Sequence, residues 1–164
     1  MSGLRIEKLT RHHAVEVFDC GSEPLNRFLT RFALTNQMAS AAQTYLALSG
    51  EIIIGFHSLA VGEIGHADAP ERLVKGLARH PVPVMILARL AVHKDWQGKG
   101  IGAGLLKDAV LRTLQAAEIA GIRAIVVHAK DEAAQRFYRR FNFVEGLGDP
   151  MHMYALIKEL RALA

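Results

Sequence analysis

A glycine-rich segment that follows an apolar stretch constrains this chain more than any other feature of its sequence. Residues 84–92 are apolar except for Arg89, which predicts a strand buried on both faces of a sheet. Glycines come at positions 98, 100 and 102, and residues 101–120 then carry apolar side chains at helical spacing. Because glycine admits positive φ, successive backbone N–H groups there can point toward one anion at the start of a helix. The sequence therefore predicts a phosphate-binding loop between a strand and a helix.

Three other interpretations of this segment fit less well. A P-loop needs Lys-Ser or Lys-Thr after its last glycine, and the chain has Gly102-Ala103-Gly104 instead. A Rossmann fingerprint is matched by Gly98, Gly100 and Ala103. Its acidic residue should come about 20 residues later, whereas Asp131 comes about 30 residues later. The third interpretation is that the glycines only begin a helix and bind no ligand. The strand before the glycines and the helix after them argue against this interpretation.

The rest of the pattern predicts a mixed α/β (α+β) fold, in which helices flank a mostly antiparallel central sheet. Apolar alternation and turn signals predict strands at residues 4–9, 44–48, 52–61, 124–129, 143–144 and 151–156. Helical spacing predicts helices at residues 23–32, 71–77 and 132–141. The strand–helix–strand–helix order of the second half predicts a right-handed crossover between parallel strands. No repeat or linker interrupts the chain, so we expect one domain over residues 1–164.

The composition narrows the class of protein. Apolar residues make up 51% and charged residues 22%, as in globular proteins, and the net charge of +4 favours an anionic partner. The single cysteine, Cys20, excludes a disulfide framework and fits a reducing compartment. No apolar signal segment opens the sequence, and the longest apolar run, residues 81–92, is too short to span a bilayer. We therefore expect a cytoplasmic protein with no membrane partner.

Two motifs follow each other in an order that is typical of one enzyme superfamily. Gln97-Gly98-Lys99-Gly100-Ile101-Gly102 fits the pattern Gln/Arg-x-x-Gly-x-Gly/Ala at every fixed position. Ala134-Gln135-Arg136-Phe137-Tyr138, with Asn142-Phe143 after it, is similar to Ala-x-x-Leu/Phe-Tyr followed by Gly-Phe. The chain thus resembles the GNAT superfamily of acyl-CoA-dependent N-acetyltransferases. It departs from the family where Asn142 replaces glycine and where Asp131 replaces a frequent Asn, which puts one side-chain contact to the cofactor in doubt.

The resemblance implies acetyl-CoA as the co-substrate and assigns residues to it. The backbone of Leu90, Ala91 and Val92 would contact the pantetheine arm and the acetyl carbonyl. Backbone N–H groups of the glycine loop would hold the pyrophosphate, from Gln97, Gly98, Lys99, Gly100, Ile101, Gly102 and Ala103. The second motif adds Asp131, Ala134 and Phe137 to the cofactor contacts, and it places Tyr138 where the thiol leaves.

Acetyl transfer to an amine needs a neutral nucleophile, a stabilised oxyanion and a partner for the departing thiolate. Full proton transfer from a phenol of pKa near 10 to a thiolate whose acid has a pKa near 8.5 is uphill by roughly 2 kcal/mol. We therefore expect Tyr138 to stabilise the thiolate by a hydrogen bond, and its neighbour Phe137 to be the core residue of the helix. The general base stays unassigned among Glu63, His57 and His93. No histidines have metal-ligand spacing, so no metal is expected.

Segments outside the two motifs point to one branch of the superfamily. They lie at residues 18–21, 25–29, 44–45, 87–90 and 151–156, with Asn36. They resemble the bacterial GNAT toxins of toxin–antitoxin modules. This resemblance implies acetylation of the amino group of aminoacyl-tRNA, a block of translation, a ribbon-helix-helix antitoxin as partner, and a homodimer. A GNAT enzyme that acts on a small amine or a protein amine, and a CoA-binding regulatory module, are the alternatives.

Four arginines adjoin residues of the predicted acetyl site and are candidates for contacts to tRNA. They are Arg89 before Leu90, and Arg136, Arg139 and Arg140 on the predicted helix of Tyr138. Such side chains would guide an acceptor stem through its phosphates rather than read its bases. The alternative is a solvated basic helix face with no partner.

Overall fold

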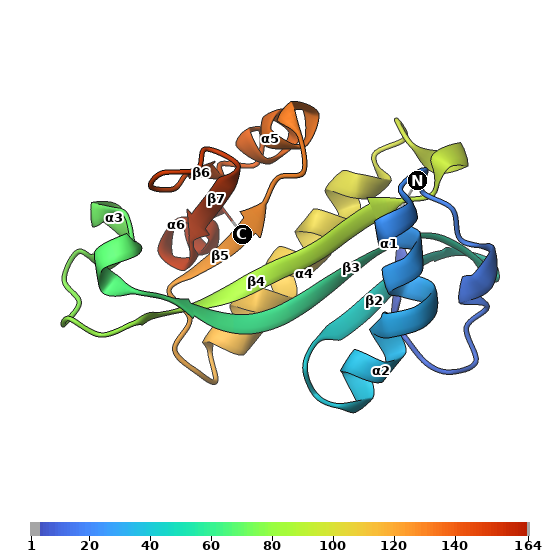
Figure 1. Ribbon diagram of the computed structural model, residues 1–164, viewed down its shortest axis with the longest axis horizontal. Helices are drawn as coiled ribbons and strands as arrows, with labels where there is room; N and C mark the ends of the chain where they lie inside the picture. The colour runs from blue at the N-terminus through green and yellow to red at the C-terminus, as the bar shows by residue number, and fades with distance from the viewer. Residues whose placement is uncertain (1–3, 164) are drawn as a thin grey trace. The chain divides into compact units, whose positions relative to one another are not determined.

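The computed structural model describes residues 4–163, and its strands and helices are labelled in Figure 1. The strands are β1 (Arg5–Lys8), β2 (Gln43–Ser49), β3 (Ile52–Ile64), β4 (Val82–Val92), β5 (Ala124–His128), β6 (Val144–Glu145) and β7 (His152–Leu156). The α-helices are α1 (Glu23–Arg27), α2 (Ala33–Met38), α3 (Glu71–Val74), α4 (Ile101–Ala117), α5 (Glu132–Arg139) and α6 (Ile157–Leu163). Short turns of 3-10 or π-helix are η1 (Val15–Val17), η2 (Phe28–Phe32), η3 (His66–Asp68) and η4 (Lys94–Trp96). Within residues 4–163, none of the helices has both the length and the apolar character that a membrane span requires.

The described residues group into two compact units, and the division between them runs through β3, β4 and α4. The first unit holds residues 4–60 and 87–109, and the second holds residues 61–86 and 110–163. The strand order is β1-β2-β3-β4-β5-β7-β6, and β1–β2, β2–β3, β5–β7 and β6–β7 are antiparallel pairs. The predicted sheet of mostly antiparallel strands with flanking helices is confirmed. The expectation of a single domain stays a prediction.

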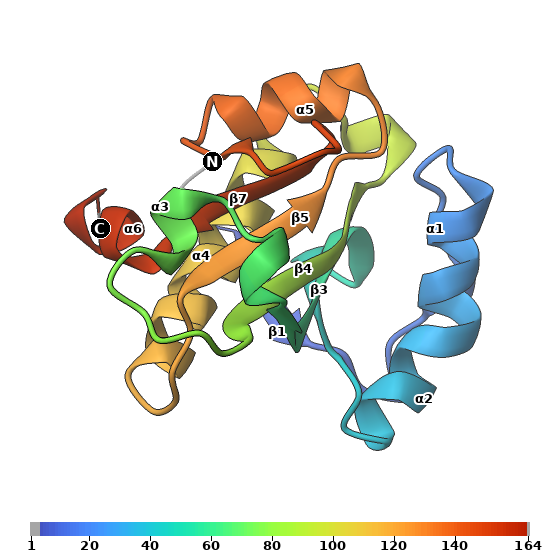
Figure 2. The ribbon, with the colours of Figure 1, turned by 60° about the vertical axis from the view of Figure 1, so that its left-hand side comes forward.

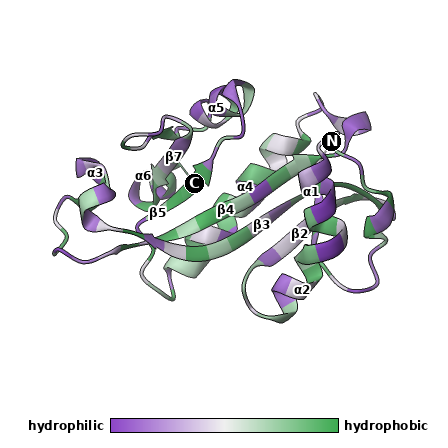
Figure 3. Ribbon diagram, in the orientation of Figure 1, coloured by the Kyte–Doolittle hydropathy of each residue, from purple (hydrophilic) through white to green (hydrophobic). Residues whose placement is uncertain are grey.

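In the first unit, alternation along β2 sends neighbouring side chains to opposite faces of the sheet, and an irregularity in the β2–β3 register at Ile54 places Ile54 and Phe56 of β3 on opposite faces. Leu46 and Phe56 are buried in a cluster with Phe28 of the π-helical turn. Ala47 and Ile54 are buried in a second cluster, with residues of α4. Helices α1 and α2 lie along one face of β2 and β3 in Figure 1, and most of the first half of β3 is hydrophobic in Figure 3. The sheet of the first unit is therefore buried on both faces.

A glycine of β3 lies against the end of β4. A Cβ at Gly55 would lie 2.7 Å from Leu105 Cδ1 and 2.9 Å from the carbonyl oxygen of Ala91. The leucine methyl group can move aside, but the carbonyl belongs to the backbone, so a larger residue would displace the end of β4. Because β4 leads into the glycine-rich loop, such a displacement would also move the start of that loop.

In the second unit, β5 and β7 pair over five residues each, from Ala124 opposite Leu156 to His128 opposite His152. The two strands run side by side in Figure 2. Ala124 and Leu156 share a buried cluster with Leu73 of α3. Arg123 secures α3 from outside this cluster, because its side chain donates hydrogen bonds to the carbonyls of Leu73 and Lys75, at 2.9 and 3.0 Å.

Several predicted helix boundaries were wrong. The helix expected over residues 23–32 is α-helical only to Arg27, continues as a π-helical turn, and then becomes α2. The helix expected over 71–77 ends at Val74, and Gly76 has a φ of +82°. Helix α4 ends at Ala117 rather than residue 120, and α5 at Arg139 rather than residue 141. Helix α6 at the end of the chain was not predicted at all.

Candidate active site

The glycine loop has the backbone that its sequence predicts. Gly98 and Gly100 have φ angles of +77° and +83°, in the region that L side chains rarely adopt. A Cβ at either position would meet no atom within 4 Å, so the backbone angle and not crowding requires glycine there. Residues 97–100 are exposed, and α4 begins at Ile101. The first turn of an α-helix leaves its N–H groups without intrahelical partners, so this loop offers N–H groups to an anion.

A positive charge lies on the same loop. The ammonium of Lys99 is 5.1 Å from the centre of the Trp96 ring, a cation–π geometry. The contact places the charge of Lys99 next to the two glycines of the loop. Together with the helix dipole, Lys99 makes the loop electropositive.

A set of hydrogen bonds from the N-terminal segment fixes the start of the loop. The side-chain amide of Gln97 donates to the carbonyl of Val92 at 3.0 Å and to that of Cys20 at 3.1 Å. The N–H of Lys94 donates to the carbonyl of Asp19 at 2.8 Å. The glycine loop is therefore held by residues that lie more than 70 positions earlier in the sequence.

The Asp19 carboxylate makes three polar contacts in the N-terminal segment that holds the glycine loop. Its carboxylate accepts the N–H of Gly21 at 2.9 Å and the side-chain amide of Asn26 at 3.0 Å, and it pairs with Lys94 at 3.2 Å. These partners, with the Gly21 hydrogen bond first, lower the pKa of Asp19 to about 2. Asn26 also accepts the N–H of Cys20 at 2.9 Å. The sequence indicated residues 18–21 only through their resemblance to bacterial GNAT toxins, and the hydrogen bonds of Asp19 and Asn26 were not predicted.

The end of β4 leads from the core toward the loop. Ala91 is buried, and Leu90 and Val92 are partly buried. Arg89 is exposed and its guanidinium lies 4.5 Å from the centre of the Phe28 ring. Arg89 thus places a positive charge on the surface of the first unit.

Two of the three candidate bases are engaged in other contacts. His57 is fully buried, and its Nε2 lies 2.8 Å from Asp108 Oδ2 while its ring stacks on Tyr45. His93 Nδ1 accepts the N–H of Asp95 at 3.1 Å, so in the neutral ring the other nitrogen carries the hydrogen. Glu63 is exposed on β3. The general base stays unassigned.

In the second unit, Asp131 caps helix α5. Its Oδ1 accepts the N–H of Ala134 at 2.8 Å, and its backbone is extended, as at other N-caps. The departure from the family pattern thus has a structural explanation, because aspartate is as good a cap as asparagine. Asn142 has a φ of +71° just after α5, which is the conformation that a glycine would take there.

The prediction that Phe137 rather than Tyr138 is the core residue of α5 was wrong. Tyr138 is only 6% exposed and its ring packs 5.5 Å from that of Phe143, whereas Phe137 is partly exposed. The reason is that the buried side of this helix carries Tyr138 and Gln135, and Tyr138 packs against Phe143. Burial raises the pKa of the Tyr138 phenol well above its ordinary value. The hydroxyl is therefore a hydrogen-bond donor and a poor acid.

The three arginines of this region are exposed but not equivalent. Arg139 forms an ion pair with Glu145. Arg140 lies 5.9 Å from the centre of the Phe137 ring. Arg136 is exposed on the same helix face, as predicted. Because its charge is already balanced, Arg139 is the weakest candidate for a phosphate contact.

Comparisons with known proteins show the family to which this chain belongs. The family model for the acetyltransferase (GNAT) domain matches residues 40–145. A tRNA-acetylating toxin of Mycobacterium tuberculosis (strain H37Rv) is 40% identical over 149 residues, which are 91% of this chain and 89% of that protein.

Two solved structures extend the likeness to nearly the whole chain. AtaT complexed with acetyl-methionyl-tRNAfMet has a TM-score of 0.89 at 28% identity, covering 98% of both chains. A tyrosine-to-phenylalanine mutant of the toxin AtaT, bound to the C-terminus of the antitoxin AtaR and acetyl-CoA, has a TM-score of 0.82 at 26% identity, covering 98% of this chain and 97% of that one. The chain belongs to the GNAT acetyltransferase family.

Proposed function

We propose that this chain is a toxin that transfers the acetyl group of acetyl-CoA to the amino group of aminoacyl-tRNA and so blocks translation. The observation that carries the proposal is its similarity, over nearly the full length of both chains, to the mycobacterial tRNA-acetylating toxin. The AtaT structures with acetyl-methionyl-tRNAfMet and with acetyl-CoA support the same substrate and co-substrate.

The glycine loop is our proposed site for the pyrophosphate of acetyl-CoA. Its positive-φ glycines, the N–H groups at the start of α4 and the charge of Lys99 suit a phosphate group. Leu90, Ala91 and Val92 would contact the pantetheine arm through their backbone. Ala134 and Phe137 stay proposed contacts to the cofactor. Asp131 is a weaker one, because its carboxylate already caps α5.

The reaction joins the amine nitrogen to the acetyl carbonyl carbon and breaks the carbon–sulfur bond of the thioester. The amine loses one proton, and CoA leaves as a thiolate that must be stabilised or protonated. Tyr138 is our candidate for that stabilisation. Because burial raises the pKa of its phenol, the hydroxyl keeps its hydrogen and donates it in a hydrogen bond. Proton transfer to the thiolate is then a late event.

Exposed arginines suit a substrate with a phosphate chain. Arg89, held over Phe28, is the best-placed candidate in the first unit. Arg136 and Arg140 are the candidates on α5, ahead of the ion-paired Arg139. Contacts of this kind would position the acceptor stem without reading its sequence.

The test is a comparison of acceptors under one set of conditions. Purified protein is mixed with radiolabelled acetyl-CoA and either aminoacyl-tRNA, deacylated tRNA, free amino acid, spermidine or a lysine-rich protein. We expect label in aminoacyl-tRNA only, and none with a Gly100→Asp variant that carries a negative charge at the phosphate site. Equal labelling of free amino acids or spermidine would contradict the tRNA assignment and identify an enzyme for small amines.

The proposed partners follow from the same branch of the family. We infer an antitoxin with a ribbon-helix-helix domain, a homodimeric toxin, and a cytoplasmic location. The AtaT structure bound to the C-terminus of AtaR supports an antitoxin as partner. Light scattering of the purified chain, alone and with the protein encoded beside it, would test the dimer and the complex.

A further inference from the structure

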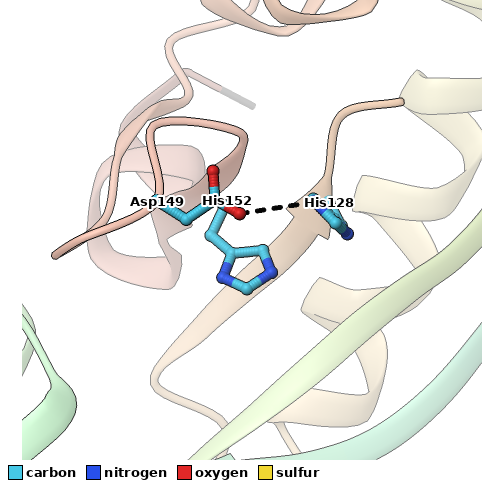
Figure 4. Close-up of side chains that lie close together, drawn as sticks. All are labelled: His128, Asp149 and His152. Atoms are coloured by element: carbon cyan, nitrogen blue, oxygen red, sulfur yellow. Dashed lines mark ion pairs between the residues drawn. The ribbon is translucent and has the colours of Figure 1, made fainter. Parts of the chain in front are cut away.

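Two histidines and an aspartate meet at one end of the β5–β7 pair, in the second unit (Figure 4). His128 is the last residue of β5 and lies directly opposite His152, the first residue of β7. Asp149 belongs to the loop between β6 and β7 and comes three residues before His152. One ligand atom of each side chain lies within 4.8 Å of the others. The sequence spacing of these residues did not reveal the group, because the sheet register creates it.

The loop holds the aspartate in a defined orientation. Asp149 Oδ1 accepts the N–H of Met151 at 2.9 Å, and its carbonyl accepts the N–H of His152 at 3.1 Å. Gly148, with a φ of +80°, allows the chain to turn immediately before it. The carboxylate therefore directs its other oxygen, Oδ2, toward His128, whose Nε2 is 3.6 Å away.

The distances between the three side chains suit a shared metal ion better than direct hydrogen bonds. A gap of 3.6 Å between Nε2 and Oδ2 is too long for a hydrogen bond. Two ligand atoms bound to the same tetrahedral Zn²⁺ at about 2.0–2.1 Å lie about 3.3 Å apart, close to that gap. The centres of the two imidazole rings are 4.3 Å apart, so a small rotation of exposed side chains brings the third ligand atom into place.

The ligand set indicates which cations fit. Two imidazole nitrogens and one carboxylate oxygen favour Zn²⁺ and neighbouring transition metals over Mg²⁺ and Ca²⁺, which prefer oxygen ligands only. All three residues are exposed, so an ion can enter from solvent and keep a water molecule as its fourth ligand. The site is separate from the transfer chemistry proposed above, in which no step uses a metal.

We propose that His128, Asp149 and His152 form a surface site for one divalent transition-metal ion, with Zn²⁺ as the best fit. Metal binding ties the end of β5 to the β6–β7 loop. In the sequence, α5 and β6 separate these two segments. Ala129 and Lys130 connect this site to Asp131, the cap of α5, so the ion also steadies the start of the helix that carries Tyr138.

The test is calorimetric titration of the full-length, chelator-treated protein with ZnCl₂. We expect one Zn²⁺ per chain with a dissociation constant on the order of micromolar. His128→Asn and His152→Asn should each weaken binding at least tenfold. His80→Asn removes another exposed histidine of the second unit and should leave binding unchanged.

A second measurement separates ligand loss from misfolding. Zn²⁺ should raise the thermal midpoint of the wild type and of His80→Asn, but not that of the two ligand variants, whose midpoints without metal should match the wild type. Co²⁺ should give the visible absorption of a tetrahedral site only where Zn²⁺ binds. No binding by the wild type at about 100-fold above the expected constant, equal binding by the two ligand variants, or equal loss in His80→Asn would overturn the proposal.

Discussion

Replacing Gly100 with alanine tests whether the positive-φ backbone of the glycine loop matters for the cofactor. Gly100 has a φ of +83°, and an alanine Cβ there would meet no atom within 4 Å. The cost of the change is therefore conformational and not steric. An L-residue in a left-handed conformation costs roughly 1–2 kcal/mol.

This conformational cost must appear either in the free energy of unfolding or in the dissociation constant for acetyl-CoA. If the loop keeps its shape, the free energy of unfolding falls by about 1–2 kcal/mol and acetyl-CoA binds as before. If the free loop relaxes, the N–H groups turn away, and acetyl-CoA must restore the strained shape on binding. The dissociation constant then rises by about 5–30-fold, which is the same free energy.

Calorimetric titration with acetyl-CoA and urea denaturation would be run on the same protein. Gly121→Ala is the matched control, because Gly121 has space for a Cβ and no positive φ. We expect the control to change neither quantity beyond a few tenths of a kcal/mol. If Gly100→Ala also changes neither, the strained backbone has no part in the loop and the argument fails. Gly100→Asp, which adds a negative charge, should weaken acetyl-CoA binding at least tenfold.

Three further predictions concern other parts of the site. Tyr138→Phe should lower kcat by about 100-fold and leave the Kd for acetyl-CoA unchanged, and an unchanged rate constant in single-turnover assays would make Tyr138 a packing residue only. Arg89→Glu or Arg140→Glu should lower kcat/KM for aminoacyl-tRNA by about tenfold and reduce its salt dependence, with acetyl-CoA affinity unaltered as the control. Asp19→Asn should destabilise the protein at neutral pH, because the folded-state pKa of Asp19 is lowered from 3.8 to about 2. The stability that the carboxylate contributes is present above pH 3.8 and is lost as the pH falls through about 2, so denaturant midpoints of the two proteins should converge there; a constant difference would rule out this carboxylate as the cause.

Local sequence patterns were sufficient to predict the structural elements that a few neighbouring residues determine. The glycine loop was predicted because positive φ at Gly98 and Gly100 is a demand that glycine alone meets easily. The hairpin of β2 and β3 was predicted from apolar runs on either side of Gly50, which has a φ of +59°. The order of the last three strands was not predicted, because β7 lies between β5 and β6 instead of following β6 at the edge of the sheet.

Features that depend on distant residues were missed. The side of α5 that is buried depends on where Phe143 packs, so the sequence of the helix alone favoured Phe137 over Tyr138. The His57–Asp108 pair joins β3 to α4 across more than 50 residues, and no local pattern indicates it. The helix ends at Arg27 and Ala117 depend on packing and on turn geometry rather than on a stop residue.

The residues that hold the glycine loop by hydrogen bonds are added to the growing chain before the proposed catalytic residue. Asp19 and Asn26 emerge first, and Lys94 and Gln97 follow as the loop itself is made. Each hydrogen-bond partner that holds the loop in the first unit is thus already synthesised when Ala109 is added. Tyr138 comes about one-sixth of the chain later, so a nascent protein has every residue of its proposed pyrophosphate site before it has its proposed catalytic hydroxyl.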